Sequence, residues 1–423
     1  MQDREIRLSG ILRHKITFHD GRAWPSLSAF AIVFFYIASI PFAAANGGDF
    51  IHLWVGARAF VTNNPELLYD PVLHRSILNA YQFPLDTYWG PRYDILGAFF
   101  YPPVTGLLYS PLGYLDPVIA QGVQAFINIG FGILSAWLLS DLIERRISFP
   151  MVILLLFLFP PFFFCFALGQ NGIQTMGLVL LGLHALKKTR PLLAGFWWSC
   201  LLYKPNWLVA IGWLPVVLRN YRIVLGLLLG ASALTLIALI VFGPSPFVSY
   251  FAVFTELLRL QELPAYPLET QYSLLSLIRR LNGINSLSDI VGWLTVLLIF
   301  CSTLRLMWLG QGVSRQHEPR NEGLIVFALA IVTAVAINPH LHHYDLLLVG
   351  AMGVVALSEM ASMEGREKQV LVAVFCFQYL AFLLEALFSA SYAIPTLSML
   401  SLLFWLKYRT WTVTRKSRLM ESS

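Results

Sequence analysis

Long apolar segments recur along the whole chain, and they limit its possible folds more than any other feature. A helix that spans a bilayer needs about 20 predominantly apolar residues. Charges and turn-forming residues divide the chain into twelve segments of roughly this kind, near residues 25–45, 117–140, 149–168, 171–186, 191–203, 205–218, 223–243, 287–308, 322–338, 344–358, 369–390 and 392–407. Only 12% of the residues are charged, too few for a soluble surface. The sequence therefore predicts an all-α polytopic membrane protein, a bundle of about 12 transmembrane helices (10–13) in one domain over residues 1–423.

Two of these segments, 191–203 and 205–218, are too short to be assigned singly. They are expected to form either two thin or tilted helices or one re-entrant hairpin. Either arrangement returns the chain to the side of the membrane that it left, so the predicted sidedness does not depend on the choice.

Positive charge is distributed unequally between the two sides of this predicted bundle. Short cytoplasmic loops collect Lys and Arg. With the N-terminus inside, the inside segments hold 22 of the 29 lysines and arginines. Both termini are therefore predicted to be cytoplasmic, and the net charge of +6 is expected to anchor the chain rather than bind nucleic acid. No clear small-residue cleavage site follows the first apolar stretch, so no cleavable signal peptide is expected.

The same topology places two long segments outside, 46–116 and 244–286. The first begins with Asn-Gly-Gly-Asp-Phe and so puts a carboxylate, Asp49, at the membrane surface. Apolar residues recur at helical spacing after Asp49, which indicates a helix in the interface plane. A second short helix is predicted at 71–81, and the apolar run over 99–112 is expected to enter the membrane without crossing it.

Polar residues from distant parts of the chain collect in this outer layer. Because they converge on one face of the membrane, we expect them to form a single site. They are His52, Arg58, Tyr101, Gln170, Asn171, Lys204, Gln271, Arg279, Arg280, His340, His342, His343 and Asp345.

Several of these polar residues have simpler explanations. Asp49 can cap the helix that follows it, since Asp is a good N-cap, and Lys204 can extend to the interface while its stem stays apolar. Arg279 and Arg280 run against the positive-inside distribution, which favours an anion-binding role. The three histidines within 340–343 suggest a metal. A structural zinc site needs a fuller set of ligands, so no metal site is predicted.

The four cysteines all fall within predicted helices and show no paired spacing. They are expected to be buried small hydrophobes rather than disulfide partners or metal ligands. The chain has no Gly-x-x-x-x-Gly-Lys-Ser/Thr loop and no Asp-x-Asp triplet, so neither a nucleotide site nor a cofactor is expected.

Short motifs follow one another in a specific order along nearly the whole chain. They are Gly-Asp-Phe at 48–50, Ala-Arg-Ala at 57–59, Leu-Tyr-Asp-Pro at 68–71, Tyr-Pro-Pro at 101–103, Ser-Pro-Leu at 110–112, Gly-Gln-Asn at 169–171, the stretch from Ala194-Gly195 to Lys204-Pro205, and Pro339 with Tyr-Asp-Leu at 344–346. In this joint order the chain resembles the family 87 glycosyltransferases.

This resemblance implies a GT-C-like bundle, a membrane enzyme that passes a sugar from a polyprenyl-phosphate carrier to an acceptor on the non-cytoplasmic side. In such enzymes an Asp in the first outer loop acts as the base, which by position is Asp49 here. A hexose, mannose by preference, a lipid or glycan acceptor and the bacterial inner (plasma) membrane are expected. The chain departs from the pattern at Asn338, where members often carry Ser, and in the spacing of its later histidines. Which of His340, His342 and His343 approaches the reaction therefore stays open.

The chemistry of such a transfer assigns roles to the polar residues. Asp49 would take the proton of the acceptor hydroxyl, with His342 or His343 orienting it or sharing its proton. Lys204, Arg279, Arg280 or a protonated histidine would neutralise the departing phosphate. The donor's apolar tail would lie between helices open to membrane lipids. The remaining residues expected to bind substrate are His52, Arg58, Tyr101, Gln170, Asn171, Gln271, His340 and Asp345.

Two other functions fit a chain of this kind. A transporter or lipid flippase would carry ionisable residues near the bilayer midplane and matching, interrupted halves. The predicted spans are nearly free of charge, apart from Glu385, and show no internal repeat. A non-catalytic scaffold of envelope assembly would need no chemistry at Asp49, so the substitution Asp49→Asn separates it from an enzyme.

Overall fold

The computed structural model describes residues 23–46, 48–62, 68–80, 99–260, 268, 271–314, 322–388 and 393–422. Within these ranges the chain forms α-helices and short 3-10 helices (η) and no strand, which confirms the all-α prediction. The main elements are α1 (Ala23–Ala38), α2 (Ile40–Asn46), α3 (Phe50–Val61), α4 (Pro71–Ala80), α7 (Pro103–Tyr109), η3 (Ser110–Tyr114), α8 (Pro117–Leu142), α9 (Phe149–Phe157), α10 (Pro160–Ala167), α11 (Gly172–Lys187), α12 (Pro191–Ser199), η4 (Cys200–Tyr203), α13 (Pro205–Gly212), α14 (Leu214–Val217), α15 (Tyr221–Phe242), α16 (Ser245–Leu260), α17 (Leu274–Asn282), α18 (Ser286–Ser314), α19 (Glu322–Ile337), η6 (His343–Leu346), α20 (Leu347–Ser358), α21 (Gly365–Phe388) and α22 (Ala393–Ser422).

Five helical segments of the described chain are long and apolar enough to cross a membrane, and the protein is therefore a membrane protein. They are Trp24–Ala45, Pro117–Leu142, Tyr221–Phe242, Ser286–Leu309 and Gly365–Glu385. Helices α9 and α10 make a sixth if they count as one span, with a bend of 66° between them. The predicted bundle of twelve spans is not confirmed, because several of the other apolar helices are shorter than a bilayer requires.

Proline accounts for much of this shortening. Pro160, Pro191 and Pro205 each stand in the first turn of a helix, where a missing N–H costs nothing. The residue before a proline is pushed out of the helical region, and Lys204 accordingly has φ −136° and ψ 77°. The segment 191–218, expected as a hairpin or two thin helices, forms the series α12, η4, α13 and α14, which breaks at Lys204 between the two predicted pieces.

Helix α12 packs on α15 through glycines. A Cβ on Gly195 would lie 2.0 Å from the carbonyl oxygen of Ile223, and one on Gly226 would lie 2.0 Å from that of Leu192. Distances this short exclude any side chain, so the two backbones touch directly. This contact fixes the helix whose continuation ends at Lys204.

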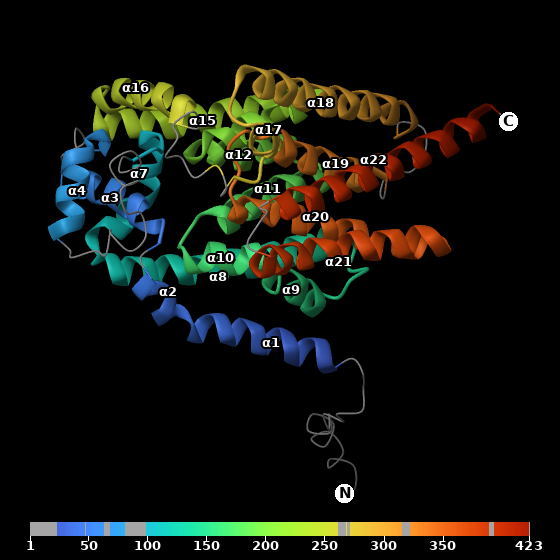
Figure 1. Cartoon of the computed structure of the whole chain (residues 1–423), viewed down its shortest axis with the longest axis horizontal. Helices are drawn as coiled ribbons and strands as arrows, with labels where there is room; N and C mark the ends of the chain where they lie inside the picture. The colour runs from blue at the N-terminus through green and yellow to red at the C-terminus, as the bar shows by residue number, and fades with distance from the viewer. Residues whose placement is uncertain are drawn as a thin grey trace, which may run out of the picture.

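Figure 1 shows the long helices lying side by side along the longest axis, with α3, α4, α7 and α16 gathered at one end. The helix predicted after Asp49 is α3, and the helix predicted at 71–81 is α4. Helix α3 packs against α7 and η3, which form from the apolar run at 99–112. Most side chains of α3 are buried, so the helix does not expose one polar face as an interfacial helix would. Trp54 Nε1 donates to the carbonyl oxygen of Leu115 at 3.1 Å.

Candidate active site

Asp49 lies in the turn between α2 and α3, at the N-cap position of α3. Its side chain makes no capping bond, and Oδ2 instead accepts a hydrogen bond from Nε2 of Gln170 at 2.9 Å. Gly48 has φ +39°, and a Cβ there would lie 2.7 Å from Cα of Leu168. The amide of Phe50 donates to the carbonyl oxygen of Leu168 at 3.1 Å. The turn with Asp49 is thus pressed against the turn with Gln170, and side-chain capping does not account for this carboxylate.

Buried amides on one face of α8 hold the turn that carries Gln170. Gln124 Nε2 donates to the carbonyl oxygen of Gly169 at 3.2 Å, and Asn128 Nδ2 donates to that of Gln170 at 3.0 Å. One turn earlier, Gln121 binds a carbonyl of α2. Because residues three or four apart share a helix face, these amides form one stripe. The stripe satisfies backbone carbonyls that water cannot reach and so fixes the position of Gln170.

Lys204 and Asp345 form a buried ion pair. Nζ of Lys204 lies 2.6 Å from Oδ1 of Asp345, and the two side chains are 9% and 0% exposed. Oδ1 also accepts from Nε1 of Trp207 at 3.2 Å, and Oδ2 accepts from the backbone amide of His342 at 3.1 Å. The ammonium lies 4.9 Å from the ring centroid of Tyr344. These hydrogen bonds satisfy both oxygens of the buried carboxylate, and they tie α13 to the loop before α20.

Gln271 fastens that loop from the other side. Its Oε1 accepts from the amide of Leu341 at 3.1 Å, and its Nε2 lies 2.9 Å from Nε2 of His342. The amide of Tyr272 donates to the carbonyl oxygen of Leu341 at 2.7 Å. Arg280 Nη2 donates to the carbonyl oxygen of Gln271 at 2.8 Å. The segment before α17 therefore sets the position of the His342 ring.

The environment of the other two histidines keeps them neutral. Burial lowers the pKa of His340 and of His343 to about 4 in each case, so neither ring supplies positive charge near neutral pH. The His343 ring packs beside the rings of Phe164 and Tyr272, at centroid distances of 4.9 and 6.1 Å. In the part of the chain that the structure describes, no group of three or more His, Cys, Asp or Glu residues could hold a metal ion.

Tyr101 and Lys204 each interact with both Asp49 and Asp345 and so connect the two carboxylates. The Tyr101 hydroxyl donates to Oε1 of Gln170 at 3.5 Å. Burial, followed by the charge of Asp49 and more weakly that of Asp345, raises the pKa of this phenol. Burial also raises the pKa of Asp49, while the hydrogen bond from Gln170 and the charge of Lys204 oppose that rise. Asp49, Tyr101, Gln170, Lys204 and Asp345 thus form one group, named here the carboxylate cluster.

Three residues expected in the site make other contacts. Arg58 Nη1 donates to the carbonyl oxygen of Gly113 at 3.0 Å, and Arg279 Nε donates to Oδ1 of Asp289 at 2.7 Å. The ring of His52 lies 5.4 Å from that of a histidine in α4. Arg58 therefore joins α3 to η3, and Arg279 joins α17 to α18.

Asn171 continues the polar layer into α11. It is fully buried, and its carbonyl oxygen accepts from the Tyr203 hydroxyl at 3.3 Å. Beside it, the Tyr109 hydroxyl donates to Oε1 of Gln174 at 2.7 Å, and Gln174 Nε2 donates to Oε1 of Gln124 at 3.2 Å. Sequence patterns did not mark these last three residues. The available signal was a set of amides spaced three or four apart within an otherwise apolar span.

Glu385, which the sequence left without a role, also contacts this region. Its Oε1 accepts a hydrogen bond from the Tyr272 hydroxyl at 2.8 Å. Thr396 Oγ1 donates to the carbonyl oxygen of Tyr272 at 2.9 Å. Helices α21 and α22 therefore hold Tyr272, whose neighbour Gln271 positions His342.

Comparison with known families decides which kind of protein carries this arrangement. The family model of glycosyltransferase family 87 matches residues 99–363, more than half of the 423-residue chain. The chain belongs to glycosyltransferase family 87. This confirms the resemblance in the motifs and indicates a glycosyltransferase built on membrane helices. The matched stretch contains Gln170, Lys204 and Asp345 and begins after Asp49, so the family match does not test Asp49.

Two further comparisons gave no match. No curated protein and no solved structure matches this chain. Membership of glycosyltransferase family 87 therefore rests on the family model alone.

Proposed function

We propose that this glycosyltransferase moves a hexose, with mannose as the first candidate, from a polyprenyl-phosphate carrier to a lipid or glycan acceptor. The observation that carries the proposal is the position of the Asp49 carboxylate. It does not cap α3, and it lies close enough to the buried ammonium of Lys204 for that charge to lower its pKa. Displacement of a lipid phosphate needs a base for the acceptor and positive charge for the leaving group. The carboxylate cluster contains one residue of each kind.

The proposed reaction is one displacement at the anomeric carbon. Asp49 accepts the proton of the acceptor hydroxyl, and the acceptor oxygen forms a bond to the anomeric carbon. The bond between that carbon and the phosphate oxygen breaks, and its electron pair leaves with the phosphate. A phosphodiester becomes a phosphomonoester, which carries additional negative charge. A nearby carboxylate also stabilises the oxocarbenium-like transition state.

The electrostatics of Asp49 suit a general base. A base works best when its pKa lies near the operating pH. Burial raises the pKa of Asp49 above its ordinary value, while Gln170 and Lys204 limit the rise. The carboxylate would then be a stronger base than an exposed Asp.

The departing phosphate would meet Lys204 first. Arg280 is the second candidate because its guanidinium contacts the backbone of Gln271, next to His342. The neutral rings of His340 and His343 would act as hydrogen-bond partners for the sugar or the phosphate rather than as cations.

The proposal also includes sidedness. The carboxylate cluster would face the periplasm or cell exterior, and both termini would lie in the cytoplasm of a bacterial inner (plasma) membrane. The support is the excess of Lys and Arg, 22 of 29, in the segments assigned to the inside. Residues 1–423 would act as one membrane-embedded catalytic domain.

Sugar transfer in lipid nanodiscs tests the proposal. The donor is radiolabelled polyprenyl-phosphate-mannose, the acceptor is a bacterial lipid extract, and the wild type is compared with Asp49→Asn. Loss of a positioned base should lower the rate by about 10² to 10⁴. The matched control is Asp116→Asn, because Asp116 is an exposed cap of α8 that accepts from the Val118 amide at 3.0 Å, and Asn caps equally well.

Full activity in Asp49→Asn would remove Asp49 from the role of base. If the wild type transfers no mannose, a panel of other lipid-linked hexoses follows. If none of these donors supports sugar transfer, the proposed donor class is contradicted, and the transporter, lipid flippase or scaffold functions are favoured.

A further inference from the structure

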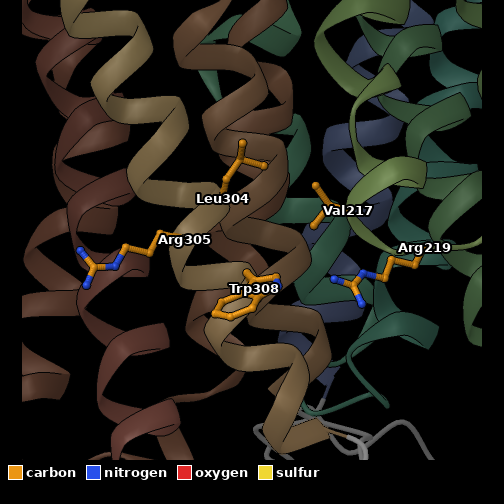
Figure 2. A pocket seen from close by; sticks show the side chains of 5 residues that line it. All are labelled: Val217, Arg219, Leu304, Arg305 and Trp308. Carbon is orange, nitrogen blue, oxygen red and sulfur yellow. The ribbon is translucent and has the colours of Figure 1, made fainter.

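A groove of about 380 Å³ opens on the surface beside α18. It is lined by Val217, Arg219, Leu304, Arg305 and Trp308. Val217 ends α14, Arg219 lies two residues later in the link to α15, and the other three belong to α18. Figure 2 shows that Arg219 extends its guanidinium toward Trp308, whereas Arg305 extends to the opposite side of α18.

This groove lies far along α18 from α17, whose preceding segment contacts His342 beside the carboxylate cluster. The start of α18 is beside α17, where Arg279 contacts Asp289. Arg305 follows Asp289 by 16 residues in the same helix, a distance of about 24 Å at a rise of ~1.5 Å per residue. The groove is therefore at the other end of α18 and belongs to a different leaflet of the proposed bilayer.

The groove carries positive charge without a matching carboxylate. Among the described residues, neither Arg219 nor Arg305 forms an ion pair, and both are exposed. Trp308 is 63% exposed, and its indole combines an apolar ring with one N–H donor. A guanidinium facing an indole offers charged and neutral donors to a phosphate.

An apolar stripe leads away from this groove along α18. Leu294, Leu297, Cys301, Leu304 and Trp308 recur every three or four residues and therefore share one helix face. Leu294 is 54% exposed and Leu297 is 53% exposed, so this face is open for half a helix length. A cationic end joined to an apolar stripe has the two-part shape of a phospholipid, whereas a free phosphate would use only the cationic end.

We propose that this groove binds the headgroup phosphate of an anionic phospholipid, with an acyl chain lying on the stripe of α18. Basic pockets between membrane helices are suited to such headgroups. The site would occupy the leaflet opposite the carboxylate cluster, and the proposal does not depend on the transfer reaction. The alternative is that Arg219 and Trp308 only anchor the helices at the interface, which would bring no preference among lipids.

Native mass spectrometry of the full chain in detergent, titrated with phosphatidylglycerol or with phosphatidylcholine, tests the site. The wild type should bind one phosphatidylglycerol more tightly than it binds phosphatidylcholine. Arg219→Gln should lower the affinity for phosphatidylglycerol by about fivefold, which is the contribution of one Arg near an anionic headgroup. The control is Arg222→Gln, since Arg222 stacks on Tyr221 at 5.9 Å and does not line the groove.

A second variant, Trp308→Ala, probes the groove without a change of charge and should weaken the same lipid while Arg219 stays in place. Equal binding of the two lipids, or equal loss in Arg219→Gln and Arg222→Gln, would overturn the proposal. Inorganic phosphate is added as a competitor. If millimolar phosphate displaces the lipid completely, the groove is a simple anion site and the assignment to a phospholipid is wrong.

Discussion

The ion pair between Lys204 and Asp345 gives a prediction whose magnitude follows from burial. Asp345→Asn keeps the shape of the side chain and removes its charge. The Lys204 side chain is only 9% exposed, so its ammonium would stay buried without a counter-ion. Removal of one partner of a buried pair costs about 3–5 kcal/mol. The new amide keeps one acceptor oxygen but turns its NH₂ group toward a donor that the other carboxylate oxygen served, so we expect a loss of at least about 3 kcal/mol.

A double variant separates charge from shape. Lys204→Met combined with Asp345→Asn removes both charges of the pair, and most of the lost stability should return. Sugar transfer should not return, because the phosphate would have lost its proposed cation. The free energy of unfolding is measured in mixed micelles titrated with SDS, with Asp116→Asn as the exposed control.

The reasoning fails under either of two results. The single variant can lose less than about 1 kcal/mol, which is the range of a surface pair. The double variant can also prove no more stable than Asp345→Asn. Either result would mean that the ion pair between Lys204 and Asp345 does not contribute to the free energy of unfolding in the way described.

Three more predictions concern neighbouring contacts. Gln170→Leu removes the hydrogen bond that opposes the rise in the pKa of Asp49, so the acid limb of the pH–rate profile should move to higher pH; an unmoved limb would show that Asp49 is not the titrating base. Gly195→Ala forces a Cβ into the backbone of α15 and should lower the free energy of unfolding by about 2 kcal/mol or more in a thermal unfolding experiment. The control is Gly130→Ala, which should be neutral or slightly stabilising because no atom lies within 4 Å of the new Cβ. Glu385→Leu removes the hydrogen-bond acceptor of the Tyr272 hydroxyl and should lower the free energy of unfolding by about 1–3 kcal/mol. Glu385→Gln keeps an acceptor oxygen and should retain most of that stability. Equal losses in the two variants would show that this hydrogen bond does not stabilise the fold.

Local patterns predicted local structure well. The apolar segment near 117–140 is α8, and the spacing after Asp49 correctly predicted α3. The predicted number of spans is not confirmed, because hydropathy reports composition, while prolines such as Pro160 and Pro205 divide apolar stretches into shorter helices.

The candidate site was predictable in its residue types and not in its pairings. Gln170 bonds to Asp49 across 121 residues, and Lys204 pairs with Asp345 across 141 residues. Contacts at such separations are set by how helices pack, and helix packing leaves only a weak pattern in one sequence. The three amides of α8 are the exception, since their spacing alone places them on one buried face.

The pairing of Lys204 with an internal carboxylate also bears on turnover. In the proposed reaction the phosphate would compete with Asp345 for a single ammonium. The anion would then gain only the difference between two attractive interactions and not the full strength of a free cation. The phosphate product would therefore leave more readily than it would from an unpaired lysine, and Asp345, held in place by Trp207 and the His342 amide, would pair with Lys204 again.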